Sequence, residues 1–191
     1  MSNEELFKKL GLHKNKYKSE ELRVFKDLVK VFEKSNLSLE HRLQNFSSYV
    51  RRQDIARFLA KYELFKLALP YHGNIIECGV FAGGGLMTWL HTSAIFEPYN
   101  HTRKIIGFDT FSGFPEVHEK DTNYGISEHL HAGAFKINSN ILNELKTLIA
   151  IHDKNRPLGH IPKVELVVGD ARETIPKYIE KNPHLLISLL Y

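Results

Sequence analysis

The sequence of 191 residues has little of several features that would place it in a specialised class. Its single cysteine, Cys78, excludes a disulfide framework and predicts a reducing compartment, the cytoplasm. No apolar run reaches the roughly 20 residues of a membrane helix, so no membrane partner is expected. The first residues also lack the basic and apolar regions of a signal peptide. We expect Cys78 to be buried in a strand as a small apolar side chain.

The charge does not gather into a patch of one sign. The net charge is +4 and the pI is about 9.0. The basic residues are interleaved with acids, as in Lys26-Asp27 and Lys61-Tyr62-Glu63. This pattern is typical of solvated helix faces. Because no platform of aromatic and basic residues accompanies it, a nucleic-acid partner is not expected.

The first third of the sequence predicts helices. A helix opens at Ser19, and residues 50–68 place apolar side chains at helical spacing. We therefore divide the sequence into a helical region, residues 1–70, and a second domain, residues 71–191. The apolar faces of the helices predict either a cover over a ligand site or a contact in a homo-oligomer.

Beyond residue 73, short apolar runs alternate with helical patterns. The expected elements are 74–78, 84–96, 104–108, 141–153, 164–168, 174–181 and 185–190. Alternation of this kind is typical of a parallel sheet with right-handed crossovers. The predicted fold class is α/β, with a doubly wound, mostly parallel sheet preceded by helices.

A glycine-rich turn follows the first of these strands. The strand ends in Glu77, and the turn from Gly79 to Gly85 leads into a helix. Such a turn presents backbone N–H groups to a ligand, and glycine lets the ligand approach closely. The spacing G-x-x-x-G-G-G differs from the G-x-G-x-x-G of dinucleotide sites, and Glu77 would repel a pyrophosphate. A cationic ligand with hydroxyls, such as S-adenosylmethionine, fits these residues.

Two further strands also end in acids. Residues 103–109 run into Asp109, which is placed to accept hydrogen bonds from ribose hydroxyls, and residues 164–170 run into Asp170. Taken singly, Glu77 could cap a helix dipole, Asp109 could form an Asx turn, and Asp170 could be the first acid of a helix. Three acids at successive strand ends favour one shared site at the carboxyl edge of the sheet.

Together these motifs resemble the macrocin O-methyltransferase (TylF-type) family. The matching segments are Glu77-Cys-Gly-Val-Phe-Ala-Gly-Gly84, Phe108-Asp-Thr-Phe-Ser-Gly-Phe-Pro115 and Gly169-Asp-Ala-Arg-Glu-Thr-Ile-Pro176, within roughly Arg51 to Tyr191. The resemblance implies a class I methyltransferase with a Rossmann-like fold. It further implies methyl transfer from S-adenosylmethionine to a hydroxyl of a sugar or sugar-containing metabolite, such as a nucleotide sugar, assisted by a divalent metal, Mg²⁺.

The resemblance also implies the roles of individual residues. The turn after Glu77 would line the methionine end of the cofactor, Asp109 would hold the ribose, and Asp170 would lie near the adenine. His131 matches a position where some relatives place a histidine near the acceptor hydroxyl, which suits a general base. The expected cofactor-binding set is Glu77, Cys78, Gly79, Val80, Gly83, Gly84, Gly85, Asp109, Thr110, Phe111, Ser112, Gly113, Gly169, Asp170 and Ala171.

The sequence departs from the family pattern at its last strand. In the family, the strand matching His184–Tyr191 continues into an Asp-x-Asp segment whose first Asp binds the metal. We therefore expect no metal ligand within residues 1–191, a sheet without its C-terminal part, and no methyl transfer by this segment alone. The apolar run 184–191 predicts a central, buried strand.

A long polar segment and two other functions complete the expectations. Residues 115–139 are predicted to form a lid over the acceptor, because long loops within compact domains are commonly functional. A non-catalytic cofactor-binding fragment is one alternative function, and an NAD-dependent oxidoreductase is another. The glycine spacing counts against the second of them.

Overall fold

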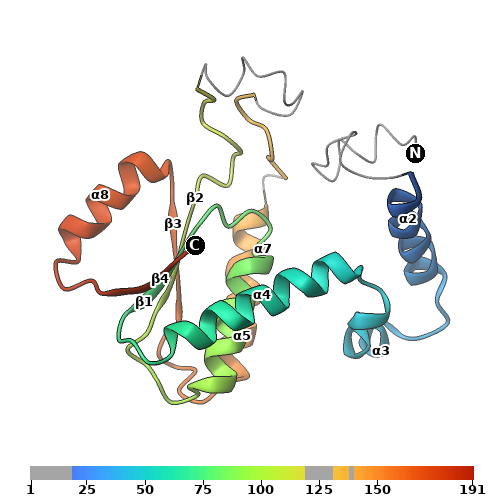
Figure 1. Ribbon diagram of the computed structural model, residues 1–191, viewed down its shortest axis with the longest axis horizontal. Helices are drawn as coiled ribbons and strands as arrows, with labels where there is room; N and C mark the ends of the chain where they lie inside the picture. Colours follow the sequence, from blue (N-terminus) through green and yellow to red (C-terminus); the bar gives the residue numbers. More distant parts are fainter. Residues whose placement is uncertain (1–18, 119–130, 138–139) are drawn as a thin grey trace. The chain divides into compact units, whose positions relative to one another are not determined.

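The structure is a computed structural model that describes residues 19–118, 131–137 and 140–191. The chain forms two compact units, one up to Leu59 and the other from Ala60 to Tyr191. Figure 1 shows the helices and strands with the labels used below.

The first unit is helical. It contains α2 (Ser19–Lys34), α3 (Leu39–Gln44), a short 3-10 helix (Phe46–Ser48) and the start of α4 (Arg52–Ala68). The Ser38 side chain caps α3 by accepting a hydrogen bond from the backbone N–H of His41 at 3.3 Å. The Phe32 ring packs edge to face on Tyr49, with 5.2 Å between the ring centres. The helices predicted from Ser19 and over residues 50–68 are therefore present.

The second unit is an α/β domain. Its strands are β1 (Asn74–Cys78), β2 (Ile105–Asp109), β3 (Val164–Val168) and β4 (Ile187–Leu190). They form one parallel sheet with the order β3-β2-β1-β4. The helices between them are α5 (Gly84–Phe96), α7 (Ile141–Lys154) and α8 (Ala171–Lys181). The predicted fold class is confirmed.

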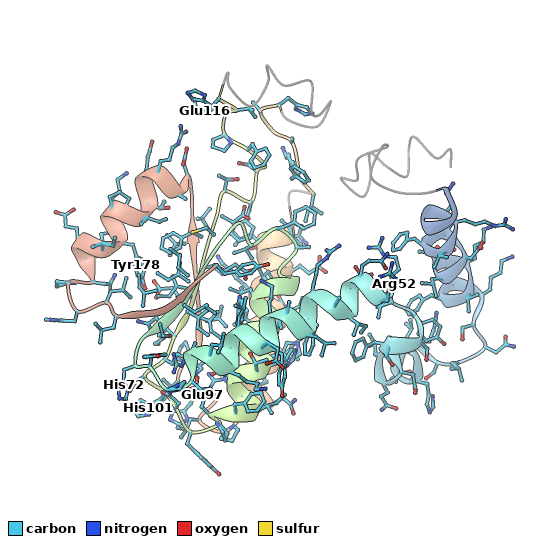
Figure 2. The ribbon with its side chains drawn as sticks, in the orientation of Figure 1. Arg52, His72, Glu97, His101, Glu116 and Tyr178 are labelled. Carbon is cyan, nitrogen blue, oxygen red and sulfur yellow. The ribbon has the colours of Figure 1, made fainter. Side chains whose placement is uncertain are left out.

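Helices cover both faces of the sheet (Figure 1). Apolar side chains from α4, α5 and α7 pack on one face around Ile75 and Ile105, and Trp89 lies fully buried among them. On the opposite face, α8 packs against Ile106 and Phe108. The Tyr178 hydroxyl of α8 donates to the Glu165 carboxylate at 2.9 Å, and its ring meets Phe108 edge to face (Figure 2). This arrangement leaves the carboxyl ends of the strands as the edge that carries the connecting turns.

Two predicted elements differ from the observed ones. Helix α8 begins at Ala171, earlier than predicted, because the Asp170 side chain accepts from the Arg172 N–H and caps it. Strand β4 lies at the end of the strand order formed by the described residues, and its predicted central place in a larger sheet stays a prediction. Leu190 is 66% exposed, so the prediction of a strand buried on both faces is wrong for the described residues.

A buried polar network ties together the amino-terminal side of the sheet. Arg103 is 3% exposed and forms an ion pair with Glu97 at 2.9 Å. Its guanidinium also donates to the Gly73 carbonyl at 2.9 Å, the Tyr71 carbonyl at 2.9 Å and the Ser188 hydroxyl at 2.5 Å. Figure 2 labels Glu97 at the opposite end of this unit from Glu116. The network therefore joins α5, the β1 entry and β4 away from the carboxyl edge.

Lys163 belongs to the same network and gives a test of it. Its ammonium is buried, donates to the Asn100 carbonyl at 2.5 Å and lies 3.8 Å from Glu97. Burial lowers the pKa of Lys163 from 10.5 to about 8, although Glu97 acts in the opposite direction.

The Lys163 pKa is lower in the folded protein than in the unfolded chain, so folding favours the deprotonated amine. The free energy of unfolding should therefore rise with pH. Relative to Lys163→Met, the free energy of unfolding of the unchanged protein should increase between pH 8 and pH 10.5. The slope should not exceed about 1.4 kcal/mol per pH unit. Chemical unfolding of both proteins across this range measures the difference. A difference independent of pH would contradict the lowered pKa.

Candidate functional site

Three turns meet at the carboxyl edge of the sheet. They follow β1, β2 and β3, as the sequence predicted. The Gly79 N–H donates to the Phe108 carbonyl at 2.9 Å, and the Gly169 N–H donates to the Asp109 carbonyl at 2.9 Å. These backbone bonds link the glycine turn to the end of β2, and the end of β2 to the turn before α8.

Asp109 connects the first two of these turns through its carboxylate. Oδ2 accepts from the Phe81 N–H at 2.8 Å, and Oδ1 accepts from the Phe111 N–H at 2.6 Å. The second bond is the Asx turn that the sequence left open as an alternative. The bond from the Phe81 N–H comes from the glycine turn, so Asp109 also joins two segments that are distant in the sequence. Each carboxylate oxygen can accept a further hydrogen bond, and the group remains suited to a ligand hydroxyl.

Three phenylalanines near Asp109 hold backbone conformations that bulky residues rarely adopt. The φ angles are 53° at Phe81, 54° at Phe111 and 63° at Phe135. Such strain persists where surrounding bonds impose it, and it gathers at functional sites. Here the Asp109 carboxylate accepts from two of the three residues. The Phe135 ring meets Phe81 and Phe114 edge to face, and the three rings are partly exposed. An aromatic rim therefore borders the edge.

The glycines of the first turn fall into two groups. Gly83 has a φ of 85°, and a Cβ there would overlap the Leu145 side chain. A Cβ at Gly85 would overlap Oε1 of Glu77, so packing inside the protein requires both glycines. By contrast, a Cβ at Gly79 or Gly84 would meet nothing within 4 Å. Gly79 still needs glycine for its φ of 88°, whereas nothing in the fold explains Gly84. The space beside Gly84 suits a closely approaching ligand.

The start of α5 lies in the same turn. Its N-cap, Gly83, has no side chain to accept from the first helical N–H groups. Such N–H groups and the helix dipole attract a carboxylate. The turn therefore offers donors to an anionic group, while Glu77 and Asp109 offer acceptors.

Glu77 lies beneath this turn in a buried polar cluster. It is 4% exposed, and its Oε1 accepts from the Lys61 ammonium at 3.1 Å. Neither Glu77 Oε2 nor the Trp89 indole nitrogen has a hydrogen-bond partner among the described residues. The Lys61 ammonium also lies 4.5 Å from the centre of the Trp89 ring and 3.2 Å from that of Tyr191. Burial raises the pKa of the Glu77 carboxyl, and the Lys61 charge opposes that effect.

Sequence reasoning missed Lys61. The prediction of a solvated side chain is wrong, because Lys61 is 7% exposed and pairs with Glu77. The alternation of charges around residues 61–63 resembled a solvated face, and the partner lies in a distant strand. A usable signal was the apolar environment of the helix position, four residues before the fully buried Phe65.

Asp170 is held by its neighbours. Its carboxylate accepts from the Arg172 N–H at 2.9 Å and pairs with the Arg172 guanidinium at 2.5 Å, which lowers the pKa of Asp170. Arg172 also pairs with Glu116 in the segment after β2 (Figure 2). The alternative reading of Asp170, as the first acid of a helix, matches this geometry. Gly169 and Ala171 flank it at the edge, and a role beside adenine stays a prediction.

The other predicted site residues differ in their exposure. Cys78 is exposed, so the prediction of burial is wrong. Successive side chains of a strand point to opposite faces, and Cys78 therefore faces away from the side on which Glu77 is buried. Partial burial and the Glu77 charge raise the pKa of the Cys78 thiol. Val80 packs its side chain into the core, which leaves only its backbone for a ligand. The Thr110 hydroxyl donates to the Gly113 carbonyl at 2.5 Å, and Ser112 is exposed.

The two ends of the predicted lid pair with each other. The Phe114 N–H donates to the Ala134 carbonyl at 3.0 Å, and the Gly133 N–H donates to the Phe114 carbonyl at 2.7 Å. His131 is exposed in the second of these segments, with Nδ1 2.9 Å from the Ala132 carbonyl. Residues 119–130 and 138–139 of the lid lie outside the described residues. The lid and the catalytic role of His131 both stay predictions.

The described residues lack both a metal-binding cluster and a membrane-spanning helix. They contain no group of three His, Cys, Asp or Glu side chains that could hold a metal ion. No helix among them has the length and apolar character needed to cross a bilayer.

Two of the solved structures that are similar to the chain are of one methyltransferase. No protein-family model and no curated protein matches the chain. The crystal structure of the calicheamicin methyltransferase CalS11 is 32% identical, with a TM-score of 0.87 over 92% of this chain and 67% of that one. An apo structure of CalS11, described as a TDP-rhamnose 3'-O-methyltransferase of calicheamicin biosynthesis, is 28% identical, with a TM-score of 0.76 over 92% of this chain and 66% of that one. The chain thus spans about two thirds of the length of CalS11.

Proposed function

The chain belongs to the methyltransferase family that includes CalS11, and from this premise we propose that it is an S-adenosylmethionine-dependent O-methyltransferase. Its acceptor would be a hydroxyl of a sugar, as in a nucleotide sugar or a glycosylated metabolite. The finer assignment, to the TylF-type family, rests on the three motifs of the sequence.

The observation that carries the proposal is the meeting of complementary groups at one edge. Asp109 offers carboxylate oxygens at the glycine turn, where it accepts from the Phe81 N–H. The backbone of Gly84 in the same turn is open, and Glu77 adds a buried carboxylate oxygen without a partner among the described residues. Hydroxyl groups, a carboxylate and cationic centres are the polar groups of S-adenosylmethionine, so these residues fit it. Residues 77–85 would hold its methionine end, residues 109–113 its ribose, and residues 169–171 the adenine side.

The protein's own contribution would be binding and orientation. Bound S-adenosylmethionine supplies an activated methyl group, so the remaining requirements are alignment of the acceptor, exclusion of water and removal of the hydroxyl proton. The aromatic rim of Phe81, Phe114 and Phe135 would exclude water at the edge. His131, in the same segment as Phe135, is the proposed base. Assistance by Mg²⁺ is part of the proposal, although the described residues assemble no ligands for it.

The test separates this function from its two alternatives. Calorimetric titration with S-adenosylhomocysteine and with NADH should give binding of the first only. Incubation of the complete gene product with S-adenosylmethionine, Mg²⁺ and a panel of nucleotide sugars, followed by mass spectrometry, should then reveal a product heavier by one CH₂ unit, whereas residues 1–191 alone are expected to give none. Binding without transfer would favour a non-catalytic cofactor-binding fragment. Binding of NADH alone would favour an oxidoreductase.

Asp109→Asn should weaken S-adenosylhomocysteine binding by about 1–3 kcal/mol, or roughly 5- to 150-fold. The amide NH₂ would face one of the two backbone N–H donors at Phe81 and Phe111, and the group would lose its charge. Calorimetry measures the affinity, and thermal unfolding confirms that the variant is folded. Glu180→Gln, an exposed change on α8, is the control and should bind as the unchanged protein does. Equal affinity in folded Asp109→Asn would remove Asp109 from the site.

A further inference from the structure

A lysine from α4 is buried against the acid that ends β1. The side chains of Lys61 and Glu77 are 9% and 5% exposed, and their charged groups lie 3.1 Å apart. The Tyr191 ring, at the end of β4, lies over the same ammonium, with its centre 3.2 Å away. The Trp89 ring of α5 lies 4.5 Å away. Lys61 thus sits among four elements of the sheet domain, directly below the glycine turn.

The pair is costly to bury and incompletely satisfied. A buried ion pair often stabilises a fold no better than apolar side chains of similar volume, because both ions lose their hydration. Glu77 Oε2 and Trp89 Nε1 also lack hydrogen-bond partners among the described residues. Buried polar groups without partners are rare in proteins, and they point to a missing ligand or water. The pair therefore has a purpose other than stability.

The charges around Glu77 show what Lys61 supplies. Burial is the largest influence on the Glu77 pKa and raises it, and the Asp109 charge on β2 raises it further. The Lys61 charge and its hydrogen bond act in the opposite direction. Trp89 carries no charge, but its indole N–H also lowers the Glu77 pKa, to a smaller extent than Lys61 does. The Cys78 thiol on β1 has a raised pKa. The Tyr191 ring faces the lysine. Lys61 is accordingly the cation that favours the ionised form of the buried carboxylate.

We infer that Lys61 is a positioning residue that holds Glu77 as a fixed, ionised acceptor for the ammonium group of the bound cofactor. The inference rests on the proposed function, because that function brings the ammonium group to residues 77–85. Gly85 supports the geometry, since any side chain there would displace Glu77 Oε1 and crowd the Lys61 ammonium. Lys61 itself touches no reacting atom.

The expected result is a change in the pH dependence of binding. In Lys61→Met the Glu77 pKa rises further, so a larger fraction of the carboxyl is protonated at a given pH and its attraction for an ammonium group weakens. Affinity for S-adenosylhomocysteine should fall at least 10-fold at pH 6 and partly recover by pH 8. Lys61→Arg, which keeps the charge, should restore much of the affinity. Lys66→Met, an exposed change on the same helix, should leave the profile unchanged.

A second variant keeps the test decisive if Lys61→Met does not fold. Glu77→Gln has the shape of protonated Glu77, so it should bind weakly and with no dependence on pH. Calorimetry between pH 6 and pH 8 measures each affinity, with circular dichroism as the check on folding. If Glu77→Gln binds as tightly as the unchanged protein, the inference is overturned, and so it is if folded Lys61→Met keeps the original profile. An unchanged protein that binds no S-adenosylhomocysteine would instead overturn the proposed function.

Discussion

Replacing Arg103 with methionine should lower the free energy of unfolding by about 3–5 kcal/mol, the range for removing one partner of a buried ion pair. The Glu97 side chain is only 11% exposed in the unchanged protein. Without Arg103, the nearest cation paired with it is Lys163, at 3.8 Å. It also removes the guanidinium donors to the Gly73 and Tyr71 carbonyls. Chemical unfolding followed by circular dichroism measures the loss.

Neighbouring Lys104 provides a matched comparison. Its ammonium donates only to the exposed Pro162 carbonyl, at 2.8 Å, among the contacts of the described residues. Lys104→Met should therefore cost about 0.5–1.5 kcal/mol, the net value of one hydrogen bond. Arg103→Lys should fall between the two, because an ammonium keeps the charge but not the forked geometry. Equal losses in Arg103→Met and Lys104→Met would show that the buried network adds little stability.

The second large effect concerns two adjacent glycines. Gly85→Ala should destabilise the protein by about 1–3 kcal/mol, because its Cβ would overlap Glu77 Oε1 inside a buried ion pair that cannot move freely. Gly84→Ala should instead leave stability unchanged or raise it by up to about 1 kcal/mol, since alanine is the better helix former and its Cβ meets open space. Thermal unfolding of both variants measures this contrast.

Gly84→Ala should also affect ligand binding. Gly84→Ala should weaken S-adenosylhomocysteine binding although the fold is intact, because the methyl group would occupy the space left for the ligand. Calorimetry on this variant, beside Glu180→Gln as the control, tests the expectation. A stable Gly84→Ala that binds normally would show that the ligand does not approach the backbone at this position.

The parts of the structure that follow from local sequence were predictable. Strands β1 and β3 and helix α5 match their predicted ranges, because short β-branched runs and glycine punctuation act on near neighbours. The meeting of the turns at Glu77, Asp109 and Gly169 was predictable as well, since parallel strands place their carboxyl ends at one edge.

What the sequence did not reveal depends on contacts between distant segments. Lys61 finds Glu77 across 16 positions, and Arg103 finds Ser188 across 85. No local pattern marks these partners, so Lys61 resembled a surface charge and nothing pointed to the buried contacts of Arg103. The exposure of Cys78 was missed for a related reason. It depends on how much of this face of the sheet is covered by α8, a helix that lies far along the sequence. The Asp109 carboxylate forms the Asx turn and also accepts from the glycine turn, and its role in a ligand site stays a prediction.

The strand order also has a consequence for how the chain reaches its native state. Strand β1 is central, yet its partner β4 is 112 positions further along, where Asn74 bonds to Leu186. Pairs that distant form late, because closing a long loop costs entropy before any contact is gained. During synthesis on the ribosome, β1 would therefore wait with one side unpaired, and its apolar edge would be open to association with other nascent chains. Arg103, whose guanidinium donates to the Ser188 hydroxyl, would secure this part of the sheet only when β4 arrives.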